Sequence, residues 1–262
     1  MSGDTPFPRR PGIPRRGRGD GQGNSRGFEV ALGYLDSQIL AGELANGSQL
    51  PPERDLAVRL GVSRGAVREA IRVLQAQGII VTHSGRSHGT RIQSMPSNAL
   101  GRILRLQLAL DALSFADLTE TRIALERAAC AAAARHRRPE TLATAAALLE
   151  RMLVVQDPIA FNQLDTDFHI ALAETGGNRL TRDLTAAIRE VIQVPIQVAE
   201  NRIADWTRLR QALIHEHNGI YEAISAGQPN LAMERAETHI RNVFLPRPID
   251  RSELGYRCQT RT

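Results

Sequence analysis

The sequence predicts a mainly α-helical protein, with an N-terminal winged helix-turn-helix that carries a small β-ribbon and a C-terminal all-α helical bundle. Aromatic residues make up only 4% of the chain, whereas hydrophobic residues make up 42%. A core built on Leu, Ile, Val and Ala favours packed helices over a β-sandwich. Residues 50–92 have the pattern of two short helices, a tight turn and two strands, and beyond residue 98 the pattern is almost wholly helical.

The basic residues are unevenly distributed along the chain. The formal net charge is +5, and every basic residue is Arg. Residues 1–97 hold 13 Arg against 8 Asp and Glu, whereas residues 98–262 hold 20 Arg and 20 acidic residues. The whole positive excess therefore lies in the first part. A basic segment beside a neutral one indicates that the first part binds a polyanion.

Composition also predicts the compartment. No run approaches the roughly 18 apolar residues that a membrane span needs, and the N-terminal arginines are not followed by the apolar stretch of a secretory signal. Cys130 and Cys258 are far apart and form no CxxC motif, which fits a reducing cytosol better than a disulfide framework. We therefore expect a soluble cytoplasmic protein with no membrane partner.

Residues 1–26 are rich in Pro, Gly and Arg and have almost nothing apolar to bury. Such a segment is expected to be disordered. It is either a solvated tail or an arm whose arginines add non-specific phosphate contacts. From Phe28 to about residue 44, apolar residues recur at helical spacing and predict the first helix of a DNA-binding domain that spans residues 27–94.

The next two helices are expected at residues 53–60 and 64–77. Gly61 is suited to end the first of them, and Ser63 is suited to cap the second. The second helix carries an apolar stripe and, roughly opposite, an arginine stripe; the apolar stripe is Val67, Ala70, Ile71 and Leu74, and the arginines are Arg64, Arg68 and Arg72. The pattern is typical of a helix-turn-helix with a recognition helix for the major groove. A solvated basic face on an ordinary helix hairpin is the alternative, which the joint occurrence of turn, cap and stripe disfavours.

After Gly78, two short apolar stretches flank the segment SGRSHG and predict a β-ribbon with a flexible tip. A wing of this kind can lie along the minor groove or the backbone of DNA. Arg86, His88 and Gly89 would then lie near phosphate.

The stretch PPERDLAVRLGVSRGAVREAIRVLQAQGII, followed by SHGTRI, resembles the winged helix-turn-helix of the GntR family of bacterial transcription regulators over residues 28–93. The resemblance implies that double-stranded DNA is contacted by Arg54, Arg64 and Arg68, and that Gly89 is the wing glycine. The expected contact set also includes Ser63 and Gly65 at the start of the recognition helix and Arg86 and His88 in the wing. Two departures from the family pattern stand out. The wing has Arg-Ser-His-Gly-Thr in place of Gly-Arg-Gly-Thr, and Gly65 and Ala66 replace hydroxyl residues, so base preference is expected to differ.

The second part is expected to form a helical domain over residues 98–246, followed by a tail at 247–262. Helices are predicted near residues 99–111, 116–136, 139–155, 158–175, 178–200, 206–226 and 229–243. They are separated at Ser114, Pro139, residues 157–158, residues 176–177 and residues 227–229. The run AACAAAA at 128–134 is expected to be a tightly packed helix face.

Four residues of this part suggest a metal site. Asp165 and His169 are four residues apart and project from one helical face, and His217 and His239 follow on two later helices. One carboxylate and three imidazoles suit a divalent transition metal such as Zn, Ni or Mn. A hydrogen-bonded core pair is the alternative. His215 is a competing candidate, although it lies about 200° around the helix from His217.

Residues 165–178 and 215–240 resemble the helical ligand-binding (FCD-type) domain of the FadR subfamily of GntR regulators. That resemblance implies a metal bound by Asp165, His169, His217 and His239. It also implies an effector pocket near Arg122, which could hold a carboxylate bidentately. A salt bridge between Arg122 and Glu126, four residues on, is the equal alternative. Asn178 is expected to be a helix cap rather than a ligand contact.

The expected function is a metabolite-responsive transcription regulator. A homodimer would bind a palindromic operator, a small carboxylate metabolite would act as effector at the metal-containing pocket, and repression relieved by the effector is the commoner behaviour that the resemblance implies. The protein would be associated with the nucleoid when bound to DNA. The alternative is a helical metalloenzyme, a hydrolase or an oxygenase, with a nucleic-acid-binding appendage. The sequence contains neither HExxH nor a Glu three residues before a His, which argues against an enzyme.

Overall fold

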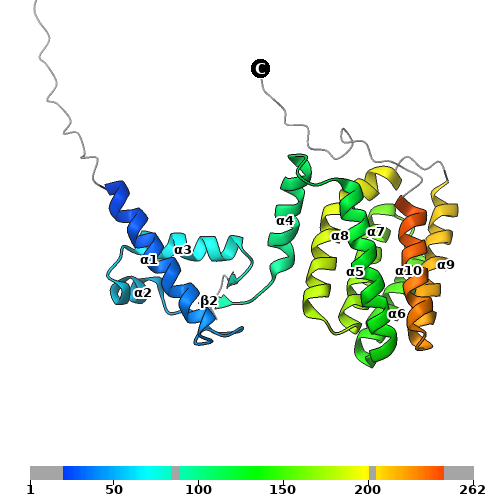
Figure 1. Ribbon diagram of the computed structural model, residues 1–262, viewed down its shortest axis with the longest axis horizontal. Helices are drawn as coiled ribbons and strands as arrows, with labels where there is room; N and C mark the ends of the chain where they lie inside the picture. Colours follow the sequence, from blue (N-terminus) through cyan, green and yellow to red (C-terminus); the bar gives the residue numbers. More distant parts are fainter. Residues whose placement is uncertain (1–19, 84–88, 201–204, 245–262) are drawn as a thin grey trace, which may run out of the picture. The chain divides into compact units, whose positions relative to one another are not determined.

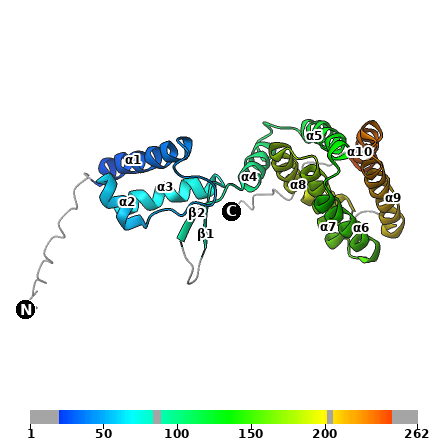
Figure 2. The same cartoon turned by 90° about the horizontal axis from the view of Figure 1, so that it is seen from below.

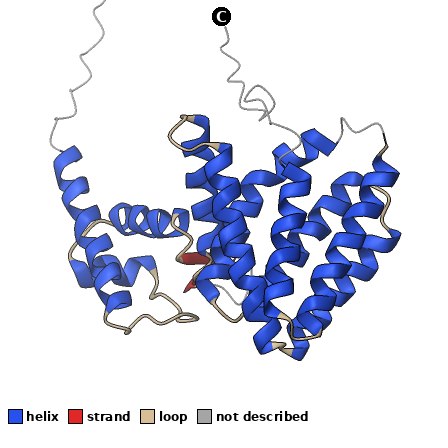
Figure 3. Ribbon diagram, turned by 45° about the vertical axis from the view of Figure 1, so that its right-hand side comes forward, coloured by secondary structure: helices blue, strands red, loops and turns tan. Residues whose placement is uncertain are grey.

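The computed structural model describes residues 20–83, 89–200 and 205–244 (Figure 1). It contains two compact units, residues 1–94 and 95–262. Helices dominate both units, and the described strands are confined to one short antiparallel ribbon (Figure 3). The predicted fold class, mainly α with a small ribbon in the N-terminal part, is therefore confirmed.

The first unit holds three helices and the ribbon, with bounds α1 Asp20–Leu40, α2 Glu53–Leu60, α3 Arg64–Ala76, β1 Ile80–His83 and β2 Gly89–Ile92. Helix α1 packs against α3, and α2 packs across α3 (Figure 2). The predicted apolar stripe of α3 is buried, and together with Ala31 and Leu35 of α1 it forms the core of this unit.

Helix α1 begins earlier than the sequence predicts. The sequence places residues 20–26 in a disordered arm, whereas α1 begins at Asp20. At Gly27, α1 lies close against α3, because a Cβ atom on Gly27 would lie 3.3 Å from the Cβ of Ala66; Ser25 and Arg26, directly before it, are exposed. Helix α1 also ends at Leu40, before Gly42, whose φ is 78°.

The turn between α2 and α3 has the geometry that the sequence predicts. Gly61 has φ 65°, in the left-handed region, and its N–H donates to the carbonyls of Ala57 and Val58. The Ser63 hydroxyl then accepts from the N–H of Ala66 at 3.1 Å and caps α3. Helix stop and helix start are thus only two residues apart, which fixes the angle at which α3 leaves the turn.

Strands β1 and β2 pair with Ile80 opposite Ile92 and His83 opposite Gly89. Ile80 and Ile92 are both buried, so this end of the ribbon is anchored in the core. Two residues predicted to touch DNA, Arg86 and His88, lie outside the described residues, and Gly89 opens β2.

The described part of the second unit consists of seven helices: α4 Pro96–Ala109, α5 Phe115–His136, α6 Pro139–Val154, α7 Pro158–Thr175, α8 Arg179–Glu200, α9 Trp206–Ser225 and α10 Pro229–Phe244. The breaks fall at the predicted positions, Ser114, Pro139 and residues 157–158, 176–177 and 227–229, whereas α4 begins at Pro96, a few residues before the predicted start near residue 99. Side-chain caps explain the starts: Ser114 and Asp117 form a capping box on α5, and Asp157 caps α7. Asn178 accepts from the N–H groups of Leu180 and Thr181, so its predicted role as a cap is confirmed.

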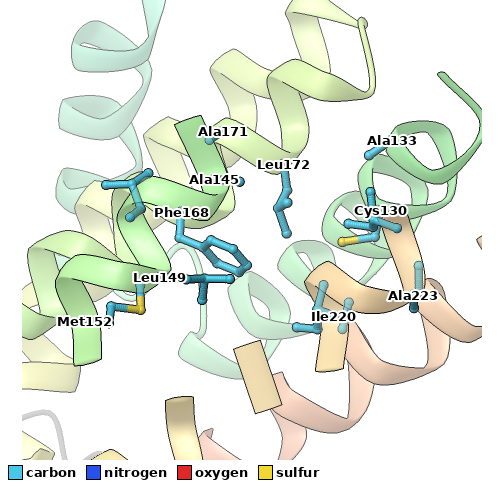
Figure 4. Packing of buried hydrophobic residues seen from close by; sticks show 14 of the residues in the cluster. Cys130, Ala133, Ala145, Leu149, Met152, Phe168, Ala171, Leu172, Ile220 and Ala223 are labelled. Carbon is cyan, nitrogen blue, oxygen red and sulfur yellow. The ribbon is translucent and has the colours of Figure 1, made fainter. Parts of the chain in front are cut away.

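Small residues let α5 approach its neighbours closely. Ala129, Cys130, Ala133 and Ala134 are buried on α5, as the alanine run predicts. At the end of α7 a Cβ on Gly176 would lie 3.0 Å from the carbonyl oxygen of Ala129. The apolar core around Phe168 joins α5, α6, α7, α9 and α10 (Figure 4). This packing brings α5, α7, α9 and α10 to a common centre.

None of the described helices is both long enough and apolar enough to cross a membrane.

Candidate metal centre and nucleic-acid interface

The four predicted metal ligands come from three helices and meet inside the second unit. Asp165 and His169 lie on α7, His217 on α9 and His239 on α10. One ligand atom from each lies within 4.8 Å of all the others. The three imidazoles are buried, and the Asp165 side chain is only 13% exposed.

The centre of this group is one oxygen of Asp165. Its Oδ1 lies 2.7 Å from Nε2 of His217, 3.6 Å from Nε2 of His169 and 4.0 Å from Nε2 of His239. The Nε2 atoms of His169 and His217 are 3.3 Å apart. The competing candidate, His215, is exposed and lies outside the group.

Two carboxylates set the orientation of two of these imidazoles. Nδ1 of His169 lies 2.6 Å from Oε2 of Glu126, and Nδ1 of His239 lies 2.8 Å from Oε2 of Glu216. Ionised carboxylates only accept hydrogen bonds, so each Nδ1 carries the proton and donates it. The Nε2 lone pairs of His169 and His239 therefore face the centre, which is the arrangement that orients metal-binding histidines.

This donor set fits a divalent transition metal. Burial lowers the pKa of all three imidazoles and takes that of His217 to about 4, so they are neutral at pH 7. Two Nε2 lone pairs and one Asp165 oxygen then converge, and among these four side chains His217 alone can supply a proton to the centre. A cation held by all four side chains requires the His217 proton to lie on Nδ1, a buried atom for which the described residues supply no hydrogen-bond partner.

Two buried arginines surround the carboxylates of the centre. Nη1 of Arg189 donates to Oδ2 of Asp165, and its Nε lies 3.2 Å from Oε1 of Glu126. Nε of Arg122 lies 2.6 Å from the same Glu126 oxygen. Burial alone would raise the pKa of Glu126, but Arg122 and Arg189 hold it well below its usual range. Burial opposes ionisation of Asp165 in the same way, and Arg189 outweighs it. Both carboxylates are thus ionised.

The structure shows the salt bridge that the sequence offered as the alternative role of Arg122. This side chain is 3% exposed and paired with Glu126. Sequence reasoning missed Arg189 and Glu216 altogether. Glu216 stands directly before His217, but neighbouring residues on a helix point about 100° apart, so adjacency did not indicate its contact with His239. Arg189 carried no signal in the sequence.

A pocket of about 370 Å³ lies between α9 and α10 and borders the centre. Its walls include Glu216 and His239, the pair on the outer side of the metal-ligand group. Other lining residues are His215, Gly219, Arg235 and Thr238.

The predicted DNA contacts of the first unit lie on its surface. Arg54, Arg64 and Arg68 are exposed. Arg68 pairs with Glu53 at 3.0 Å, a partly exposed ion pair of the kind that contributes about 1 kcal/mol or less. The Ser63 hydroxyl is engaged in the α3 cap, and the Cα of Gly65 faces open space apart from that hydroxyl.

Two family models match the two units. The model described as "Bacterial regulatory proteins, gntR family" matches residues 29–91, and the model described as "FCD domain" matches residues 117–242. The first covers the helix-turn-helix and ribbon. The second covers all four predicted metal ligands.

Individual proteins match over most of the chain. The Glc operon transcriptional activator of Escherichia coli (strain K12) is 26% identical over 222 residues, which is 82% of this chain and 86% of the relative. The transcriptional repressor NanR of Klebsiella aerogenes is 28% identical over 222 residues, 82% of this chain and 83% of the relative. Among solved structures, the GntR protein of Streptococcus agalactiae matches with a TM-score of 0.58 and 27% identity, over 82% of this chain and 98% of the other.

The buried imidazoles predict how the stability of the metal-free protein depends on pH. His217 titrates near its ordinary value of about 6.5 when unfolded and at about 4 when folded. Its contribution to stability is therefore complete above pH 6.5 and is lost as pH falls toward 4, because the unfolded chain takes up the proton first. Chemical denaturation of chelator-treated protein between pH 7.5 and 4 measures this slope.

In that window His217→Gln is expected to reduce the slope by about one proton, roughly 1.4 kcal/mol per pH unit. His215→Gln, a change at an exposed position, serves as the matched control and is expected to keep the wild-type slope. An unchanged slope in His217→Gln would contradict the burial of a neutral imidazole at this position.

The metal content of two alanine variants tests which histidine of α9, His217 or His215, is a metal ligand. His217→Ala removes an Nε2 that faces the centre and is expected to weaken metal binding about a hundredfold or more, since outer partners alone contribute 10- to 100-fold. His215→Ala leaves the centre intact and is expected to keep the wild-type metal content. Elemental analysis of the dialysed proteins measures both, and equal metal in His217→Ala and wild type would remove His217 from the site.

Proposed function

This chain belongs to the GntR family of bacterial regulatory proteins and carries an FCD domain, and from this premise we propose that it is a metal-dependent repressor that a small organic acid releases from its operator. It is a DNA-binding transcription regulator and not an enzyme. The observation that carries the metal-dependent part of the proposal is the meeting of one carboxylate oxygen and three Nε2 atoms within 4.8 Å of one another.

On the DNA side, we propose that a homodimer binds a palindromic operator. The capped start of α3 supports this, because Arg64 and Arg68 lie in the first two turns of a helix whose opposite face is buried. A recognition helix contacts base edges with its N-terminal residues, and two copies read half-sites about one helical turn of DNA apart. Arg54 at the start of α2 and the wing residues Arg86 and His88 would add contacts to phosphate.

On the ligand side, we propose that the metal is held by Asp165, His169, His217 and His239. A bound divalent metal would supply a Lewis-acid site for a carboxylate oxygen. Four protein ligands complete the shell that Zn²⁺ prefers, whereas a six-coordinate metal such as Ni²⁺ or Mn²⁺ would retain two positions for the effector. Arg122 contacts Glu126, which in turn contacts His169 of the proposed metal site. We propose that Arg122 also takes part in holding the effector carboxylate.

The relatives differ in whether their names describe activation or repression, since one is named as an operon activator and another as a repressor. We propose repression for this chain. In the repressor sense, the effector binds the DNA-free form more tightly than the DNA-bound form. By linkage, DNA must then weaken effector binding by the same factor. This reciprocity gives the proposal a quantitative consequence for any effector found.

Loss of the two arginines of α3 tests the DNA surface. The double variant Arg64→Ala/Arg68→Ala is expected to lose specific binding to the promoter DNA of its own operon by about a hundredfold or more, because each base or phosphate contact contributes about 1 to 3 kcal/mol. Gel-shift titration at fixed salt measures it. The exposed Arg151 of α6 provides the control, and Arg151→Ala is expected to bind as wild type. Normal operator binding by the double variant would refute the assignment of α3.

A thermal-shift screen of small organic acids tests the ligand side. In the metal-loaded protein an acid present at about 100 times its Kd is expected to stabilise by about 2.7 kcal/mol, and hence to raise Tm by several degrees. The same acid is expected to have little effect after chelation, or in Asp165→Asn. An acid that stabilises metal-loaded and metal-free protein equally would show that the metal is not part of the effector site.

A further inference from the structure

We propose that Arg189 is a resident counter-cation of the metal centre: it neutralises Asp165 in the absence of metal, weakens metal binding, and thereby leaves the charge of a bound metal available to an anionic ligand. The inference rests on the proposed metal centre and adds to it a residue that sets the electrostatics of that centre. Arg189 touches no proposed ligand atom that faces the centre, so it acts through Asp165 and Glu126.

Arg189 forms ion pairs with two carboxylates at once. Its side chain is 0% exposed, and its guanidinium bridges two carboxylates from two different helices. Nη1 binds Oδ2 of Asp165, the oxygen that does not face the imidazoles, and Nε and Nη2 lie 3.2 and 3.4 Å from the two oxygens of Glu126. Asp165 therefore presents Oδ1 to the centre while its other oxygen is engaged.

The charges around the centre balance without a metal. Asp165 and Glu126 carry two negative charges, Arg122 and Arg189 carry two positive charges, and the imidazoles are neutral. A further carboxylate, Glu216, binds His239 on the outer side and lies outside this buried group; it is 24% exposed, so solvent screens its charge. A divalent cation raises the balanced group to +2 in a buried environment, where uncompensated charge is costly. A carboxylate at an open metal position would reduce that excess.

Removal of Arg189 makes the net charge of the centre more negative by one, both without and with a bound metal. Without it, the metal-free centre carries one uncompensated negative charge and both carboxylates lose a hydrogen-bonding partner. A divalent cation would then meet a site more negative by one charge and would bind more tightly. The metal-loaded centre would in turn be less positive, so an added carboxylate would bind more weakly. A structural role alone predicts a loss of stability but no opposite changes in metal and anion affinity.

Arg210 provides the matched control for a structural role. It is also buried, at 6% exposure, and it lies on α9 in the same unit. Its guanidinium donates to the carbonyl oxygens of Met152, Leu153 and Val155 at the end of α6, not to carboxylates. Arg210→Met is therefore expected to lower stability while leaving metal and anion affinities unchanged.

The experiment titrates full-length protein first with Co²⁺ and then with acetate, and follows the visible absorption of the bound Co²⁺ and the Tm. Relative to wild type, Arg189→Met is expected to lower the Tm of the metal-free protein, to bind Co²⁺ about tenfold or more tightly, and to bind acetate about tenfold or more weakly. Arg189→Lys, which keeps the charge but not the planar fork, is expected to keep both affinities within about threefold of wild type.

A second background keeps the test decisive if Arg189→Met does not fold. Glu126→Gln leaves an excess positive charge, and Glu126→Gln/Arg189→Met removes it, so the double variant is expected to be the more stable metal-free protein. It is also expected to bind Co²⁺ about tenfold or more tightly than Glu126→Gln alone. Equal or weaker Co²⁺ binding after removal of Arg189, in either background, overturns the inference.

Failure of the metal centre itself has a different signature. Asp165→Asn is expected to lose Co²⁺ binding. If wild type binds no Co²⁺, or if Asp165→Asn binds it as wild type does, the proposed metal centre fails and the inference fails with it. If wild type binds Co²⁺ at Asp165 but the affinity is indifferent to Arg189, the metal centre stands and the inference alone is overturned.

Discussion

The helical unit depends on a buried network of two arginines and two carboxylates. Arg122 and Glu126 lie on α5, Asp165 on α7 and Arg189 on α8, and each charge is neutralised by a partner within the network. Loss of one member would leave an uncompensated buried charge, at a cost of about 3 to 5 kcal/mol. The network therefore fixes the relative positions of three helices, and with them the position of the metal-ligand group.

Glu126 connects this network to the metal centre, because its second oxygen accepts from Nδ1 of His169. The three imidazoles differ in how firmly they are held. His169 is held by a fully buried carboxylate and His239 by the half-buried Glu216, whereas Nδ1 of His217 has no hydrogen-bond partner among the residues that the structure describes. The part of the centre that faces α5 and α8 is thus held by buried ion pairs. The part that borders the pocket between α9 and α10 is closer to solvent.

The two units place their functional groups by different means. In the first unit, function follows from local structure: Gly61 ends α2, Ser63 starts α3, and the burial of Val67 and Ile71 turns Arg64 and Arg68 outward. In the second unit the metal-ligand group needs α7, α9 and α10, whose ligands span residues 165 to 239. The close approach of α5, allowed by its alanines and by Gly176, brings Glu126 to that group.

The sequence by itself determined the elements that short-range chemistry controls: the helix breaks, the caps Ser63 and Asn178 and the apolar stripe of α3. It also pointed, by spacing and by family resemblance, to the four candidate metal ligands that the structure brings together. The start of α1 at Asp20 falls in a stretch for which the sequence predicts disorder. Arg189 and Glu216 became visible only in the tertiary structure. From the sequence alone, an arginine at position 189 could equally face solvent. Helix packing buries Arg189 between Asp165 and Glu126. Because a buried charge is costly unless it is paired, burial requires Arg189 to form ion pairs with these two carboxylates.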